Sequence, residues 1–145
     1  MSQPIILASG SEIRQQLLTK AGVKFEVKPA RIDEQAIKEA LVAEDAKPRD
    51  IADALAEFKA RKVSDKHPGA LVIGCDQVLN FQGQILSKPE TPEAAKKQLE
   101  MLRGQTHELI SAAVICENGK PIWRKVDTVR LTMRVFSDEN LSEYV

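Results

Sequence analysis

The sequence predicts an α/β fold in which a mixed central sheet is flanked by helices. Short apolar runs alternate along the chain with longer segments whose apolar residues recur at helical spacing. The continuous apolar run at 70–73 is typical of a strand that is buried on both faces. Asn118-Gly119 stands between two apolar runs and is the clearest hairpin signal in the chain.

The first half of the chain is predicted to alternate strands with helices. Ser11 can cap a helix that Gly22 ends, and a strongly periodic segment follows Pro48. The expected elements are a strand at 4–8, a helix at 11–21, a strand at 25–27, and helices at 34–45 and 50–66. Their apolar faces are expected to comprise Ile13, Leu17, Leu18 and Ala21, then Ile37, Ala40 and Leu41, then Ile51, Leu55 and Phe58.

The second half is predicted to consist mainly of strands. The buried strand that starts at 70 leads to Asp76 and a hairpin turn follows at 80–84; Thr91 and Pro92 then begin a helix that Gly104 ends. The other expected elements are a strand at 106–116, a turn at 117–120, and a return strand in which Val129, Leu131, Met133 and Val135 alternate with Arg130, Thr132 and Arg134. A last helix is expected from Ser137, with Leu141, Tyr144 and Val145 in an apolar row.

Length and composition favour a single domain over residues 1–145. The chain is 43% hydrophobic, which suffices for a core, and its 21 basic and 21 acidic side chains leave no net charge. A neutral chain argues against a dedicated nucleic-acid or membrane-surface binder. No apolar segment is long enough to span a bilayer, and the N-terminus lacks a signal-peptide pattern. Cys75 and Cys116 are expected to be free thiols, so we expect a cytoplasmic protein.

Asp76 is the first candidate functional residue. It directly follows an apolar run, and a charge in that position is costly to bury without a partner. In open α/β sheets, ligands bind at the carboxyl ends of the strands, where Asp76 is expected to lie. The alternative interpretation is an aspartate that only caps a turn.

Several candidates for phosphate binding lie elsewhere in the chain. Ser9 and Ser11 precede a helix whose free N–H groups suit an anion, and Arg14 lies one turn further on. Lys59 shares a helix face with the apolar Leu55 and Val63. The alternatives are an ordinary helix cap, a solvated arginine and a lysine whose ammonium group reaches out to water.

Acidic residues complete this set. Asp33-Glu34 could hold a divalent cation or could be simple first-turn acids. Serines, Arg14, Lys59 and Lys88 for phosphate, with Glu34 and Asp76 for metal and water, are the residues that phosphoryl chemistry requires. His67 and His107 have no nucleophile nearby in the sequence and are taken as structural.

The order of these segments resembles the Maf family of septum-formation-inhibitor-like proteins, which are metal-dependent nucleoside triphosphate pyrophosphatases. The resemblance covers nearly the whole chain. The matching segments are Leu7-Ala8-Ser9-Gly10-Ser11 with Arg14, Leu17 and Leu18; Asp33-Glu34; Lys59-Ala60; Gly74-Cys75-Asp76-Gln77-Val78; Leu86-Ser87-Lys88-Pro89; and Leu102-Arg103-Gly104-Gln105-Thr106-His107.

The resemblance implies a role for each matching residue. Asp76 corresponds to the general base that activates water, and Glu34 to an acidic residue associated with metal and catalysis. Asp76 and Glu34 would together hold Mg²⁺ or Mn²⁺. The residues implied to hold the substrate are Ser9, Ser11, Arg14, Lys59 and Lys88. Ile13 and Gln77 fall at positions linked to base selectivity, and Gln77 resembles the branch that prefers 7-methyl-GTP.

This chain departs from the family pattern in two places. Glu12-Ile13 stands where the family usually has Pro-Arg or Pro-Trp, which leaves the preferred base open. Members of the family also continue beyond the position of Val145. We therefore expect uncovered apolar surface and a partly open nucleotide cleft, and we keep a homodimer as an open alternative. Two functions are then compatible with the sequence. One is hydrolysis of a nucleoside triphosphate, with a modified or non-canonical base as one option, to the monophosphate and pyrophosphate. The other is nucleotide binding without turnover in a protein linked to septum formation.

Overall fold

The computed structural model describes residues 3–86 and 89–134. The elements are β1 (Ile5–Leu7), α1 (Glu12–Lys20), β2 (Glu26–Val27), α2 (Glu34–Ala43), α3 (Pro48–Ser64), β3 (Leu71–Phe81), β4 (Gln84–Leu86), α4 (Pro92–Leu102), β5 (Thr106–Glu117) and β6 (Lys120–Thr132). In these residues one sheet runs in the order β2-β1-β3-β5-β6, with β4 paired to β3. The pairs β1–β2 and β1–β3 are parallel and the others antiparallel, which confirms the predicted mixed sheet.

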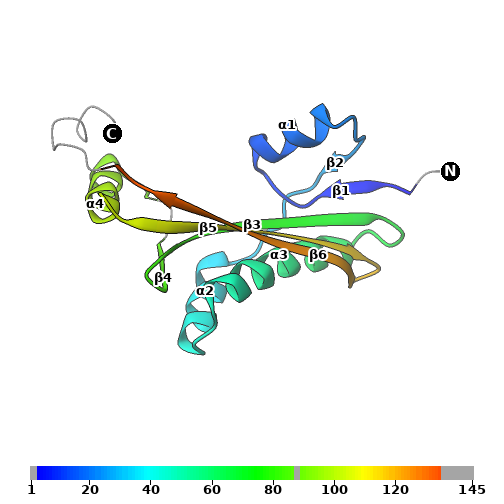
Figure 1. The fold of residues 1–145 in the computed structure, drawn as a ribbon. Coiled ribbons are helices and arrows are strands. Elements are labelled where there is room, and N and C mark those ends of the chain that lie inside the picture. Colours follow the sequence, from blue (N-terminus) through cyan, green and yellow to red (C-terminus); the bar gives the residue numbers. More distant parts are fainter. Residues whose placement is uncertain (1–2, 87–88, 135–145) are drawn as a thin grey trace.

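Helices lie on both faces of this sheet. α2 and α3 cover one face, whereas α1 lies on the other face beside β1 and β2 (Figure 1). The core forms between α3 and the even-numbered residues of β3 and β5, because successive side chains of a strand point to opposite faces. Its fully buried members include Leu55, Val72, Val114 and Cys116. None of the helices in the described ranges is long and apolar enough to cross a membrane.

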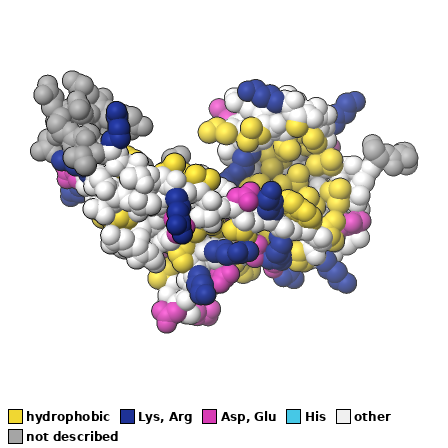
Figure 2. Space-filling view, in the orientation of Figure 1, with side chains coloured by type: hydrophobic (Ala, Val, Ile, Leu, Met, Phe, Trp, Pro, Cys, Tyr) yellow, Lys and Arg dark blue, Asp and Glu magenta, His cyan; other side chains and the backbone are white. Residues whose placement is uncertain are grey.

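The face of the sheet opposite α3 is only partly covered. Figure 2 shows hydrophobic side chains gathered between α1 and the sheet, in a hollow on this side of the molecule. Trp123, Val129 and Leu131 belong to this face, because they pair with the odd-numbered residues of β5, and they are 49%, 54% and 39% exposed. The described residues therefore leave apolar area on this face in contact with solvent.

Most of the predicted turns and caps are confirmed. Ser11 caps α1 and Thr91 caps α4 through their side-chain oxygens. Both hairpin turns have two central residues with positive φ, which is the geometry of the tight turns that suit a twisted ribbon. These central residues are Gln82 and Gly83 in one turn, Asn118 and Gly119 in the other. The predicted helix after Ser137 lies outside the described residues.

Three predicted apolar faces need correction. α1 has no buried residue, and Ile13 and Leu17 are 71% and 61% exposed, because this helix lies beside the short strands at the sheet margin. Ala40 of α2 is exposed, whereas Ile37 and Leu41 pack on the core as expected. Phe58 is 47% exposed. α3 packs on the sheet through Ala56 and Ala60. Phe58 comes two positions after Ala56, so its side chain points about 200° away around the helix.

The strand that contains Asp76 also differs from the prediction. β3 continues to Phe81, so Asp76 lies inside the strand rather than at its end. The run at its start is buried on one face only, since Val72 is fully buried while Leu71 and Ile73 are partly exposed. β1 pairs with β3 only as far as Ile73, and its last residue is Leu7. Asp76 therefore lies just beyond the carboxyl end of the neighbouring parallel strand β1.

Gly74 sets the distance between α3 and β3. A Cβ atom at this position would lie 2.2 Å from the carbonyl oxygen of Ala56 and 2.7 Å from the nitrogen of Ala60. Both contacts are with helix backbone, so a side chain at 74 could only be accommodated if the whole helix moved. The absence of a side chain here lets α3 approach the strand closely, two residues from Asp76.

Gly74→Ala is therefore expected to lower the free energy of unfolding by about 1–3 kcal/mol, the usual cost of overpacking a core. Urea denaturation measures this change. Gly10→Ala is the matched control, because a Cβ there would contact only the ring of Pro29 at 4.0 Å. If both variants were equally stable, the close approach of helix and strand would not constrain the fold.

Candidate active site

A buried carboxylate and two partners form the centre of the candidate site. Asp76 on β3 is 8% exposed, and its Oδ1 accepts a hydrogen bond from Lys59 Nζ of α3 at 3.1 Å. The same Nζ lies 2.5 Å from Oε1 of Glu34, the first residue of α2. Lys59 also donates to the carbonyl oxygen of Cys75 at 3.3 Å. One ammonium group therefore bridges two carboxylates that come from different elements.

One oxygen of Asp76 has no partner. Its Oδ2 is buried and accepts no hydrogen bond from the described residues. A buried oxygen without a donor is costly, and such exceptions call for an explanation such as a functional role or a bound water or ion. The unpaired Oδ2 is therefore the position at which a water molecule or a cation would be held.

Burial controls the protonation of this carboxyl group. Desolvation raises the pKa of Asp76 above its usual value, and the nearby Lys59 offsets part of that rise. Glu34 raises the same pKa a little further, and Lys38 lowers it. A carboxylate whose pKa is raised is a stronger base than an exposed aspartate, which suits removal of a proton from water.

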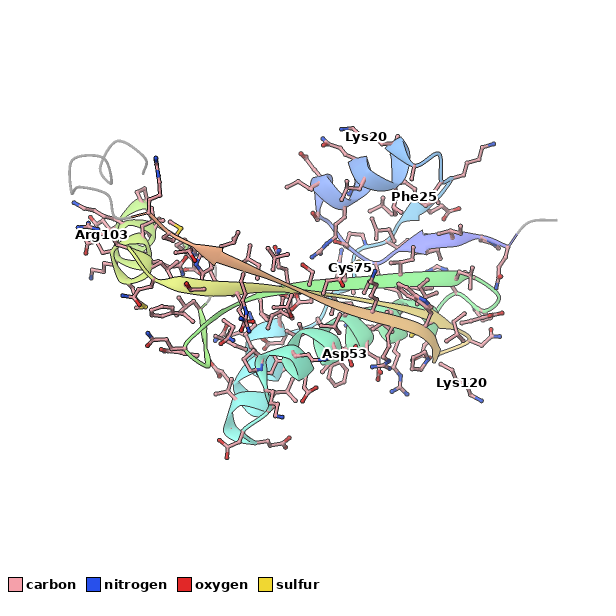
Figure 3. All side chains as sticks on the ribbon, in the orientation of Figure 1. Lys20, Phe25, Asp53, Cys75, Arg103 and Lys120 are labelled. Atoms are coloured by element: carbon pink, nitrogen blue, oxygen red, sulfur yellow. The ribbon has the colours of Figure 1, made fainter. Side chains whose placement is uncertain are left out.

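A second set of polar contacts surrounds the start of α1. Ser9 is buried, and its Oγ accepts hydrogen bonds from the Ser11 N–H at 3.2 Å and from Nη1 of Arg14 at 3.3 Å. Arg14 Nη1 also donates to the carbonyl oxygen of Cys75 at 3.5 Å. Arg14 and Lys59 therefore approach the same point of β3, beyond the end of β1. Figure 3 labels Cys75 in the middle of β3, below α1.

The structure thus joins most of the predicted site residues in one contact network. The members of this network are Ser9, Ser11, Arg14, Glu34, Lys59 and Asp76. Lys88 lies outside the described residues. Gln77 points to the opposite face of β3 from Asp76, where its amide donates to Ser111 Oγ at 3.3 Å. Ile13 is exposed on α1.

Lys38 is a further charged residue that interacts electrostatically with Asp76 and that the sequence interpretation did not single out. It lies four residues after Glu34, so both share one side of α2, and it is partly buried. Lys38 also lines a cavity of about 300 Å³ with Gln35, Glu39, Val42, Ala43 and Ile85. The helical spacing from Glu34 was the signal that could have identified it.

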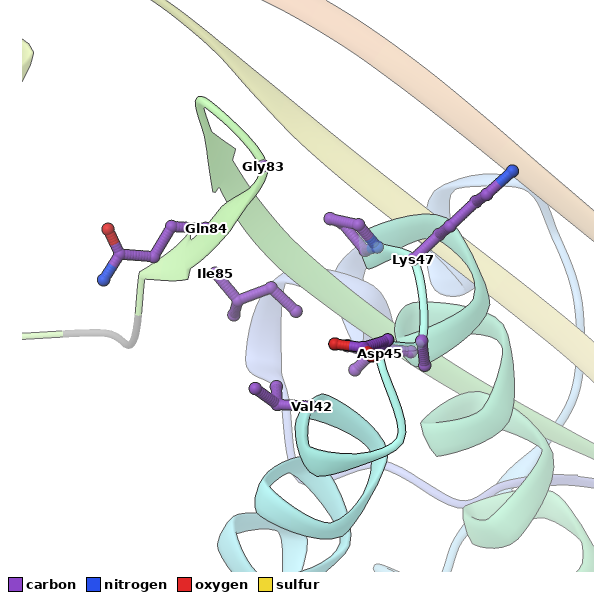
Figure 4. Close-up of a pocket in the computed structure, with 9 residues that line it drawn as sticks. Val42, Asp45, Lys47, Gly83, Gln84 and Ile85 are labelled. Atoms are coloured by element: carbon purple, nitrogen blue, oxygen red, sulfur yellow. The ribbon is translucent and has the colours of Figure 1, made fainter.

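A larger cavity lies next to the smaller one. It has a volume of about 550 Å³ and opens between the end of α2, the start of α3 and the β3–β4 hairpin (Figure 4). Val42 and Ile85 line both cavities, so the two are neighbours. The wall is mainly apolar, with Asp45, Lys47 and Gln84 as its polar residues.

Comparisons with known proteins agree with this architecture. A family described as Maf-like protein matches residues 4–145. A nucleoside triphosphate pyrophosphatase of Ruegeria pomeroyi is 63% identical over all of this chain and 73% of its own length. A 7-methyl-GTP pyrophosphatase of Brucella abortus is 43% identical with the same coverage. A dITP/XTP pyrophosphatase structure from Mycobacterium abscessus has a TM-score of 0.54 at 17% identity, covers 88% of this chain and 71% of that one, and supports the fold alone.

Proposed function

We propose that this chain, which belongs to the Maf family, hydrolyses a nucleoside triphosphate to the monophosphate and pyrophosphate. Relatives that are 43% and 63% identical over the full chain bear names of this activity. The observation that carries the proposal is the unpaired, buried Oδ2 of Asp76 beside the ammonium group of Lys59. Attack of water on a phosphate requires a base that takes the proton of the water and a cation that neutralises phosphate charge, and Asp76 and Lys59 can supply these two groups.

In this reaction the water oxygen bonds to the α-phosphorus and the anhydride bond to the β-phosphate breaks. Asp76 takes the proton of the water as the new bond forms, and the released electron pair stays on the β-phosphate oxygen. Lys59 and Arg14 neutralise phosphate charge, and Ser9 and Ser11 offer hydroxyl groups to the phosphate oxygens. Lys88 is assigned to the same task by its place in the family pattern.

A divalent cation, Mg²⁺ or Mn²⁺, fits the donors of this site. Glu34 and Asp76 offer hard carboxylate oxygens, and one of these oxygens has no partner. The described residues contain no group of three or more side chains that would hold a metal alone. Mg²⁺ commonly binds to one or two carboxylates and completes its shell with substrate phosphates and water. When bound, the cation would neutralise charge on the phosphates. Lys59 would then be free to move from the carboxylates to a phosphate oxygen.

Base selection is assigned to the opposite side of β3. Gln77 is exposed there and offers an amide that can donate and accept hydrogen bonds at a base edge. Ile13 lies on α1, which covers part of the same face. Because a relative that is 43% identical is named a 7-methyl-GTP pyrophosphatase, we propose a modified base such as 7-methylguanine, or a non-canonical base.

A nucleotide panel with Mg²⁺ and Mn²⁺ tests the function. The expected result is metal-dependent release of pyrophosphate, with 7-methyl-GTP or a non-canonical nucleotide preferred over GTP. The same samples are tested for a shift in melting temperature. A melting shift without any product would instead favour the alternative, a nucleotide-binding protein linked to septum formation. A result with no melting shift and no product would contradict both functions.

Three further expectations stay predictions. A location in the cytoplasm and the absence of a nucleic-acid partner rest on the balanced charge and the free thiols of Cys75 and Cys116. A homodimer would cover the exposed apolar side chains of β6. The predicted apolar row of Leu141, Tyr144 and Val145 lies outside the described residues. Analytical ultracentrifugation measures the oligomeric state directly.

A further inference from the structure

Lys38 is a partly buried cation on α2. In the ranges 3–86 and 89–134 it forms no hydrogen bond or ion pair, although it follows Glu34 by one helical turn. Lys59, in contrast, contacts two carboxylates and a carbonyl oxygen. A cation that loses hydration without gaining a partner is poorly stabilised. Such a group is available to bind an anion.

Lys38 is linked to the active site through Glu34, which lies one helical turn before it on α2, and it also lines a cavity. Its positive charge is felt by the carboxyl group of Asp76. The cavity of about 300 Å³ that it lines is bounded by α2 and by Ile85 of β4. Lys38 therefore interacts electrostatically with Asp76 and also lines this cavity.

The proposed placement of the substrate indicates which of its phosphate groups lie toward α2 and Lys38. The residues assigned to the base, Ile13 and Gln77, belong to the side of the sheet on which α1 lies. α2 lies on the other side (Figure 1). If the base is on the side of α1 and the α-phosphate is at Asp76, the β- and γ-phosphates extend toward α2.

We propose that Lys38 binds the β- and γ-phosphates of the substrate and the pyrophosphate formed from them. The inference rests on the proposed function, because it assumes cleavage between the α- and β-phosphates. As that bond breaks, the Lys38 ammonium group, which forms no hydrogen bond or ion pair with the described residues, would neutralise the negative charge that develops on the leaving oxygen of the β-phosphate. Lys38 would thus be a substrate-binding residue specific to the leaving group.

Lys38→Gln tests this role. A hydrogen bond to a charged group contributes about 1.5–3 kcal/mol, so inhibition by inorganic pyrophosphate is expected to weaken by roughly tenfold to a hundredfold. KM for the triphosphate should rise as well, whereas inhibition by the nucleoside monophosphate should stay unchanged, because that product lacks these phosphates. Lys38→Arg should restore most of the pyrophosphate affinity. Lys97→Gln, an exposed position on α4, is the matched control.

Direct binding separates this inference from the proposed function. Calorimetric titration of the wild type and both variants with inorganic pyrophosphate and Mg²⁺ needs no turnover. If the wild type binds pyrophosphate and Lys38→Gln weakens it while no nucleotide is hydrolysed, the proposed function fails and the anion site stands. If nucleotide is hydrolysed and Lys38→Gln binds pyrophosphate as tightly as the wild type, the role of Lys38 is wrong.

Discussion

Asp76→Asn is expected to lower kcat by about a hundredfold or more, the usual size of a general-base contribution. The substitution keeps the shape of the side chain and removes the oxygen that would accept the proton. The amide oxygen of the introduced asparagine can still accept a hydrogen bond from Lys59, so the loss should appear in kcat rather than in KM. Steady-state kinetics on the preferred nucleotide measures both constants.

Although kcat is expected to fall, the free energy of unfolding of Asp76→Asn is predicted to stay the same or to rise. The pKa of Asp76 is raised in the folded protein, mainly by burial, so the ionised form is destabilising there. An aspartate with a raised pKa binds more protons folded than unfolded. The wild type therefore loses stability as the pH rises from the usual aspartate range through the raised pKa. Asp76→Asn should not show this loss of stability over that pH range. At neutral pH its melting temperature should be at least as high as that of the wild type.

Asp65→Asn provides the control for both measurements. Asp65 is exposed at the C-terminal end of α3 and belongs to none of the contacts of the candidate site. This variant should retain the turnover and the stability of the wild type. Near wild-type turnover in Asp76→Asn would rule out Asp76 as the general base.

Most residues of the contact network around Asp76 were predicted from the sequence to lie together, whereas the geometry of the network was only partly predictable. Asp76 was inferred from a charge that follows an apolar run, and this inference does not depend on where β3 ends. The end itself was placed wrongly because a charge usually terminates a buried strand. Here β1 stops opposite Ile73, and the open edge and Lys59 accommodate the carboxylate within the strand.

Helix faces were harder to predict. Periodicity shows which residues of a helix form an apolar face, but it does not show which element packs against that face. Phe58 belongs to the apolar stripe of α3 by spacing, yet Gly74 draws the alanines of α3 onto the sheet and turns Phe58 outward. The same packing places Lys59 beside Asp76. The sequence places a lysine in an apolar row, but the carboxylates that explain it come from α2 and β3, which only the fold brings together.

Lys59→Met is expected to have the largest effect on stability. Lys59 is the cation that bridges Glu34 and Asp76, and the side chains of Lys59 and Asp76 are 13% and 10% exposed. Removal of one partner of a buried ion pair leaves the other charge uncompensated and typically costs roughly 3–5 kcal/mol. Urea denaturation at neutral pH should show a loss of this size. The deficit should shrink as the pH falls, because protonation of Asp76 removes the uncompensated charge.

A double variant separates the structural role of Lys59 from its proposed role in binding phosphate. Lys59→Met combined with Asp76→Asn removes both charges of the pair, so most of the lost stability should return. Turnover should not return, because base and phosphate-binding cation are both gone. The coupling energy in stability measures the ion pair itself. Equal stability of the single and double variants would mean that Asp76 does not depend on Lys59, and the proposed transfer of Lys59 from carboxylate to phosphate would lose its physical basis.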